Sequence, residues 1–205
     1  MSPRRRDAEG TAAARAQRRA ELLATAAEVF ASQGSAATTV RKVADAAGIL
    51  GGSLYYHFDS KEAMADEILS TFLDEMWAAY ERILGSGRSA RDTLEGIVVE
   101  SFRTIDRHRP AVVLYQNESR HLAASERFGY LRDSRDRFEE MWLSLLQRGM
   151  EEGAFRADLD PGLVYRFIRD TVWVAANWYQ PGGRLSADDI AKQYLAMFLE
   201  GIQAS

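Results

Sequence analysis

Apolar residues recur at intervals of three and four along almost the whole of this 205-residue chain. That spacing places side chains on one face of an α-helix. No alternating run of Val, Ile and Thr bounded by turn residues is present, so strands are not expected. Glycine and proline divide the pattern at Gly34, Gly48, Gly85, Pro110 and Pro181. With 46% hydrophobic residues available for a core, the chain is predicted to be an all-α protein.

Composition excludes several classes of protein. Cysteine is absent, so neither a disulfide framework nor a thiolate metal site is available. No run of about 18 apolar residues occurs, and we therefore expect no membrane span. Residues 1–17 are rich in Arg and Ala and lack the apolar stretch of a secretory signal. These features predict a cytoplasmic protein that needs no cofactor and no metal.

Charge differs between the N-terminal part of the chain and the rest. Residues 1–62 carry 9 basic and 7 acidic residues, whereas residues 63–205 carry 17 basic and 23 acidic ones. A basic head on an acidic body fits a protein that binds nucleic acid through its N-terminal part. The difference is small, so the motifs decide the prediction.

The stretch Thr38–Phe58 contains two short predicted helices separated by a turn at Gly48, which is the signature of a helix-turn-helix. The apolar positions expected to hold the helices together are Val40, Val43, Ala44, Ala47, Ile49, Leu54 and Phe58. The side chains expected to face outward are Arg41, Ser53, Tyr55, Tyr56 and His57. Such residue types suit phosphates and base edges. The alternative for either tyrosine alone is that it packs against the first helix.

This stretch, together with Ser60-Lys61-Glu62, resembles the DNA-binding head of the TetR family of transcriptional repressors. The resemblance implies that residues 52–57 form the recognition helix in the major groove. It also implies contacts to phosphates or bases by residues at five matching positions, namely Thr39, Arg41, Tyr55, His57 and Lys61. A homodimer on a palindromic DNA site is expected, since each head has one short reading helix.

Two residues depart from the family pattern. Leu50 stands where the family usually has a Ser or Thr that caps the recognition helix, and Gly51 stands where a polar DNA-contacting residue is common. Gly51 and Gly52 would let the backbone approach DNA closely. Sequence specificity would then shift to Ser53, Tyr56 and the arginines of residues 4–6, which would follow a minor groove.

The rest of the chain resembles the family more loosely, through L-x-x-G-x-x-x-G-A-F-R-x-D-x-D-P over residues 146–161. The resemblance implies that helices of about 161–179 and 187–202 from two subunits form a four-helix dimer interface, and that the preceding helices enclose an effector pocket. The predicted organisation is a flexible basic arm (1–12), a three-helix helix-turn-helix DNA-binding domain (13–60, motif about 39–58) and a ligand-binding and dimerisation domain (61–205).

The helix predicted from Pro161 suggests where an effector binds. Arg169 and Trp173 lie one turn apart on its more polar half and together would offer a cation and a flat apolar surface to an anionic, ring-bearing ligand. The alternative is an Arg–Trp stack across the dimer interface. Further candidate ligand-binding residues are Arg166, Trp142, Tyr115 and Trp77, for which an ordinary core position is the alternative.

Within the family, the body resembles actinobacterial repressors of cholesterol-ring catabolism. That resemblance implies a small-molecule effector that is a coenzyme A thioester of a steroid-ring fragment, for which arginine would bind the phosphates. The main rival classes are a transcriptional activator and a helical acyl-CoA-binding enzyme. The histidines at 57, 108 and 121 do not converge in a catalytic or metal-ligand spacing. We therefore expect no enzyme and no catalytic residue.

Overall fold

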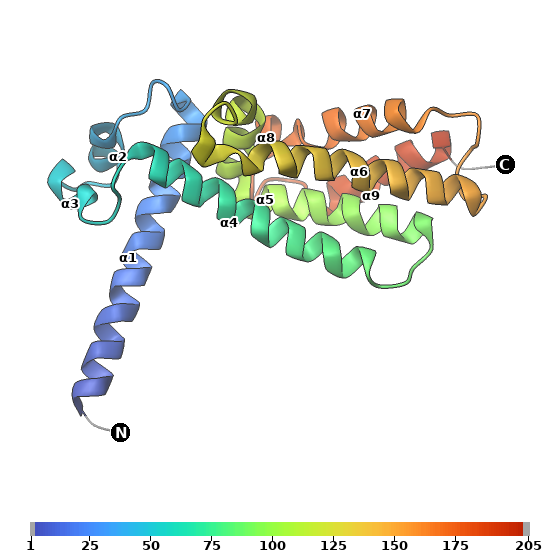
Figure 1. Ribbon diagram of the computed structural model, residues 1–205. Coiled ribbons are helices and arrows are strands. Elements are labelled where there is room, and N and C mark those ends of the chain that lie inside the picture. Colours follow the sequence, from blue (N-terminus) through green and yellow to red (C-terminus); the bar gives the residue numbers. More distant parts are fainter. Residues whose placement is uncertain (1–2, 203–205) are drawn as a thin grey trace. The chain divides into compact units, whose positions relative to one another are not determined.

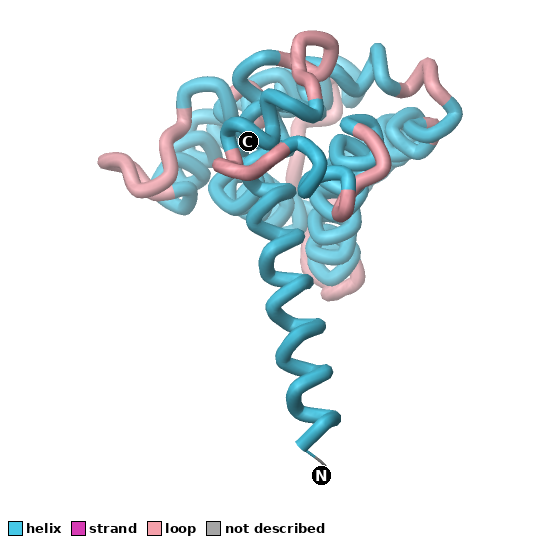
Figure 2. Tube along the Cα trace, turned by 90° about the vertical axis from the view of Figure 1, so that its left-hand side faces the viewer, coloured by secondary structure: helices cyan, strands magenta, loops and turns pink. Residues whose placement is uncertain are grey.

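The computed structural model describes residues 3–202, and every regular element in that range is a helix (Figure 2). The prediction of an all-α protein is confirmed. The chain divides into two compact units, a head that ends at Ser70 and a body that begins at Thr71. The boundary lies inside helix α4 (Lys61–Leu84), whereas the sequence placed it before the first residue of that helix.

The head contains α1 (Pro3–Gln33), α2 (Val40–Ala46), α3 (Gly51–Tyr55) and the start of α4. Helix α1 begins at Pro3, so residues 3–12 are helical, whereas the sequence analysis predicts a flexible arm there. Alanine, arginine and glutamate are strong helix formers, and proline is tolerated at the first helical position. Residues 1–2 and the side chains of the arginines at 4–6 lie outside what the structure describes.

The predicted helix-turn-helix forms, with its recognition helix at Gly51–Tyr55 rather than over residues 52–57, so that His57 lies beyond the end of this helix. Helix α1 packs on α2, and α2 packs on α3. Gly34 ends α1 with a φ of 78°, and Gly48 makes the turn after α2 with a φ of 67°, two left-handed conformations that favour glycine. The buried side chains of this small core include Leu22, Phe30, Val43, Ala44, Leu54 and Phe58.

The body contains the rest of α4 and helices α5 (Ala90–Leu122), α6 (Tyr130–Glu151), α7 (Pro161–Val172), α8 (Ala175–Trp178) and α9 (Ala187–Ile202), with a 3-10 turn at Glu126–Phe128 (Figure 1). Helix α5 lies at the centre, against α6, α8 and α9. It bends at His108, whose φ of −127° and ψ of 28° are not helical. Pro110 explains the bend because it lacks an N–H and restricts the residues before it.

The helix predicted over residues 161–179 is interrupted, which corrects the sequence analysis. Helix α7 ends at Val172, and α8 starts only at Ala175. The Thr171 hydroxyl donates to the carbonyl oxygen of Phe167 at 2.5 Å, a side-chain bond that often bends helices. The β-branched residues Thr171, Val172 and Val174 are also weak helix formers. Trp173 therefore lies at the end of a helix rather than in the middle of one.

Candidate nucleic-acid interface and effector pocket

The outer surface of the helix-turn-helix presents most of the residues predicted to contact DNA. Arg41, Ser53, Tyr55 and Tyr56 are exposed, and Gly52 is exposed beside them. The two tyrosine side chains are 58% and 69% exposed, so neither is a core residue. The structure brings these residues together on one motif, and their contacts with DNA remain a prediction.

Tyr56 also contacts α1, which is the alternative interpretation that the sequence analysis gives for either tyrosine alone. The Arg15 guanidinium lies 5.0 Å from the centre of the Tyr56 ring, within the range of a cation–π contact. His57 meets the same ring edge to face at 5.4 Å and is half-buried. The Arg15 contact fixes the position of Tyr56 while leaving most of its surface free.

Two of the predicted DNA-contacting residues also hold the head together. Thr39 caps α2, since its hydroxyl oxygen accepts a hydrogen bond from the Lys42 backbone N–H at 3.3 Å. Lys61 is half-buried at the start of α4, and its Nζ donates to the carbonyl oxygens of Ser35 at 2.7 Å and Thr38 at 3.0 Å. The Lys61 ammonium thus ties α4 to the turn between α1 and α2, a role the sequence did not reveal.

In the body, a cavity of about 360 Å³ lies between α4, α5, α6 and α7. The aromatic residues that line it are Phe72, Tyr115, Phe138, Trp142, Tyr165 and Trp173. The polar residues that line it are Gln116, Asn117, Ser119, Arg120, Arg135, Arg169 and Asp170. Its volume is within the range of small-molecule sites, and it combines an aromatic wall with a few charged groups, as such sites commonly do.

Trp173 belongs to the aromatic wall of this cavity. Only 8% of its surface is exposed, and its ring meets those of Phe72 and Phe138 edge to face at 6.5 and 6.2 Å. Such pairs are favourable beyond the area that they bury. The alternative of an Arg–Trp stack across the dimer interface does not fit this position, because the ring is buried within its own chain.

Arg169 lies at the same cavity and is held by a neighbour. Its Nε and terminal nitrogen donate to the two carboxylate oxygens of Asp170 at 2.7 and 3.1 Å, and its guanidinium lies 5.6 Å from the ring centre of Tyr165. The hydrogen bond from Arg169 lowers the pKa of Asp170. Burial raises the pKa of Tyr115 to about 12, so this cavity residue is neutral at physiological pH. With three arginines and one aspartate, the lining is positively charged.

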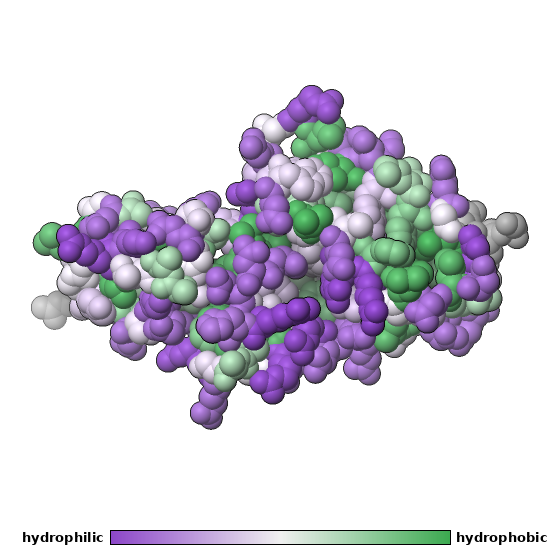
Figure 3. Space-filling view, turned by 90° about the horizontal axis from the view of Figure 1, so that it is seen from above, coloured by the Kyte–Doolittle hydropathy of each residue, from purple (hydrophilic) through white to green (hydrophobic). Residues whose placement is uncertain are grey.

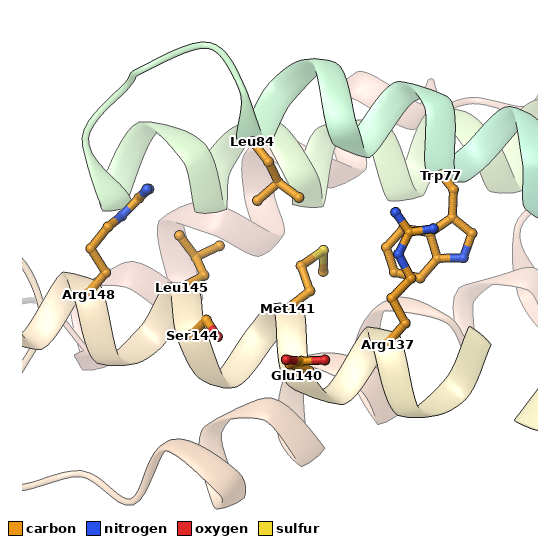
Figure 4. Close-up of a pocket in the computed structure, with 8 residues that line it drawn as sticks. All are labelled: Trp77, Leu84, Arg137, Glu140, Met141, Ser144, Leu145 and Arg148. Carbon is orange, nitrogen blue, oxygen red and sulfur yellow. The ribbon is translucent and has the colours of Figure 1, made fainter. Parts of the chain in front are cut away.

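Two candidate ligand-binding residues do not line the cavity. Arg166 is exposed on α7. Trp77 lies in a separate groove between α4 and α6, where the Arg137 guanidinium covers its ring at 4.0 Å (Figure 4). The Trp77 Nε1 donates to the Ser134 hydroxyl at 3.0 Å, which makes it a satisfied core residue, the alternative left open for it.

Sequence reasoning missed several lining residues, because only packing brings them together: Phe72, Arg120, Arg135 and Phe138.

The C-terminal helices carry exposed apolar side chains on the body. Leu163, Phe167, Val174, Trp178 and Met197 are between 46% and 81% exposed. In the face shown in Figure 3, hydrophobic groups gather toward the right-hand end of the body and are bordered by polar ones. Large apolar side chains left exposed in numbers commonly mark interaction sites on proteins. The five side chains lie on or next to α7, α8 and α9, the helices of the predicted dimer interface.

Within residues 3–202, no helix is long and apolar enough to cross a membrane. The same part of the chain holds no group of three or more His, Cys, Asp or Glu side chains placed to bind a metal ion.

Comparison with known proteins assigns the family. Residues 22–68 match the bacterial regulatory proteins of the tetR family, and residues 87–202 match the tetracyclin repressor-like C-terminal domain. The transcriptional repressor KstR2 of Rhodococcus jostii is 52% identical over 90% of this chain and 91% of its own length. KstR2 of Mycobacterium tuberculosis is 51% identical over 90% of this chain and 92% of its own length. These relatives are transcriptional regulators.

Solved structures of other proteins have the same fold as this chain. The ketosteroid regulator KstR2 of M. tuberculosis superimposes with a TM-score of 0.89 at 50% identity, covering 92% of this chain and 96% of its own. AibR, crystallised with isovaleryl coenzyme A and operator DNA, superimposes with a TM-score of 0.74 over 88% of this chain and 97% of its own, and at 19% identity it shows the fold alone. On these grounds the chain belongs to the TetR family of transcriptional regulators.

Proposed function

We propose that this chain is a cytoplasmic repressor of steroid-catabolism genes, released from a palindromic operator by a coenzyme A thioester of a steroid-ring fragment. The observation that carries the proposal is the cavity of the body, in a chain that is 52% identical to a KstR2 repressor. We expect no enzymatic turnover of the thioester.

The cavity suits the two halves of such a ligand. Phe138, Trp142 and Trp173 offer aromatic surface for an apolar ring system. Arg120, Arg135 and Arg169 offer guanidinium groups, which bind phosphates through paired hydrogen bonds. The volume of about 360 Å³ is near the lower end for ligand sites. The ring fragment would therefore fill the cavity, and the nucleotide of coenzyme A would extend beyond it.

Helix α4 supplies a route for coupling ligand to DNA. Its first residue, Lys61, holds the turn between α1 and α2, and its Phe72 lines the cavity. A ligand that displaces Phe72 or Trp173 would act on the helix that anchors the head. Pairing of two bodies through the exposed apolar side chains of α7, α8 and α9 would place two heads on two half-sites.

The test is release of labelled operator DNA, measured by fluorescence anisotropy while acyl-CoA thioesters of different ring content are added. A steroid-derived thioester should release the operator, and free coenzyme A should not. Arg169→Met should bind operator as the parent does and respond to at least tenfold more thioester. Arg166→Met is the matched control, since Arg166 is exposed on the same helix outside the cavity. Equal responses of both variants and the parent would contradict the proposed site.

A further inference from the structure

The N-terminal end of α3 carries an exposed leucine that nothing in its own head explains. Leu50 is 82% exposed, the most exposed of the large hydrophobic side chains that the structure describes. It occupies the N-cap position of α3 and makes no side-chain capping hydrogen bond. A Ser, Thr, Asn or Asp at an N-cap stabilises a helix by about 1 kcal/mol relative to an apolar residue. Leu50 thus gives up a cap and gains no burial within the head.

The two residues after Leu50 are also costly for the fold. Gly51 and Gly52 have no positive φ, and a Cβ added to either would meet no atom within 4 Å. Neither backbone conformation nor packing therefore requires glycine here, although glycine loses more conformational freedom on folding than alanine does. A side chain at either position would occupy open space beside the helix. Without it, the closely fitting surface of another molecule can approach the backbone.

If the proposed function holds, the molecule that fits against this end of α3 is operator DNA. In a helix-turn-helix the N-terminal residues of the recognition helix meet base edges in the major groove. At this end of α3 the only side chains beyond Cα belong to Leu50 and Ser53, because residues 51 and 52 are glycine. The buried Leu54 anchors the helix from its other side. The glycines would let the backbone come close enough for Leu50 to reach a base.

We propose that Leu50 reads a thymine, by packing its side chain against the C5-methyl group of one thymine in each operator half-site. Leucine has no hydrogen-bonding group and cannot recognise the donors and acceptors of the other base edges. The thymine methyl is the apolar group that the major groove displays. Leu50 would thus be a specificity-determining residue, at a position where the family usually has a capping Ser or Thr.

The test is a uracil scan, which removes one methyl group at a time. The intact protein first selects its operator from a pool of random duplexes. Each thymine of the selected half-site is then replaced by uracil, symmetrically in both half-sites, and affinity is measured. Burial of one methyl group is worth about 0.8 kcal/mol, or about fourfold per half-site. With both half-sites replaced, we expect a loss of about 15-fold at one thymine with the parent protein, and none there with Leu50→Ala.

Two further variants make the result decisive. Leu50→Ser restores a capping hydroxyl, so its helical signal and melting temperature should match or exceed those of the parent while the thymine dependence disappears. Arg41→Ala removes an exposed cation and should weaken binding to all duplexes alike, leaving the thymine dependence intact. If no palindrome is selected, the proposed function fails and this inference with it. A selected palindrome whose uracil scan is the same for the parent and Leu50→Ala overturns this inference alone.

Discussion

Replacement of Lys61 by Met tests how the head is held together. The Lys61 ammonium donates to two backbone carbonyl oxygens, those of Ser35 and Thr38, at 2.7 and 3.0 Å. Hydrogen bonds from a charged group contribute about 1.5–3 kcal/mol each. Because Lys61 is half-buried and water can replace part of what is lost, we expect the pair together to contribute about 1.5–3 kcal/mol. Methionine keeps the length of the side chain and removes the donors.

The loss should be local, so the assay is amide hydrogen exchange. Each 1.4 kcal/mol is a factor of ten, and protection of the α2 amides should therefore fall by about 10-fold to 100-fold. Amides in the centre of α5, in the body, should be unaffected. Arg41→Met is the matched control, because Arg41 is exposed and its ion pair with Asp45 is long, at 3.9 Å. Unchanged α2 protection in Lys61→Met would refute the reasoning.

The same variants measure the predicted phosphate contacts. A residue that neutralises one phosphate contributes about one unit to the slope of log affinity against log salt. The Lys61 ammonium has a third N–H beyond the two that bind carbonyl oxygens. We expect the slope to fall by about one unit for both Lys61→Met and Arg41→Met. A loss of affinity at constant slope in Lys61→Met would leave the carbonyl contacts as its only role.

Substitutions at three further positions test the body. Gly149→Ala should destabilise it by at least 1–3 kcal/mol in denaturant unfolding, because the added Cβ would lie 2.0 Å from the Phe155 ring; an unchanged midpoint would contradict the close packing of this pair. Phe167→Glu, at a side chain that is 58% exposed, should shift the protein from dimer to monomer in sedimentation without loss of helix. Trp173→Ala should cost about 3–5 kcal/mol of stability because the ring is buried, whereas Trp173→Phe should fold normally and bind the thioester more weakly in calorimetry.

Local signals in the sequence mark several of the helix ends. Gly34 and Gly48 adopt the left-handed conformations expected after α1 and α2, and Asp160 caps α7 through a hydrogen bond from the Leu163 N–H at 2.6 Å. Such signals act over three or four residues and are visible in a sequence. The break after Val172 was missed, because a hydrophobic pattern continues across it and the cause lies in one hydroxyl and a run of β-branched residues.

The candidate sites were predicted unevenly for a physical reason. The exposed face of the helix-turn-helix follows from a short motif, so Arg41, Tyr55 and Tyr56 were placed from sequence alone. The cavity instead depends on which faces of four helices meet. Periodicity places Arg169 and Trp173 on one side of a helix, but it does not show that Phe72 and Arg135 join them. Nor does it show that Trp77 faces a different groove.

The most direct test of the whole account is the reciprocity of ligand and DNA binding. Operator affinity is measured with and without saturating steroid-derived thioester, and thioester affinity is measured with and without saturating operator. If one coupling free energy links the two sites, the two ratios must be equal, and we expect a factor of about 5–150. Thioester that binds the body with the same affinity whether or not operator is bound would contradict the claim that this protein is a ligand-released repressor.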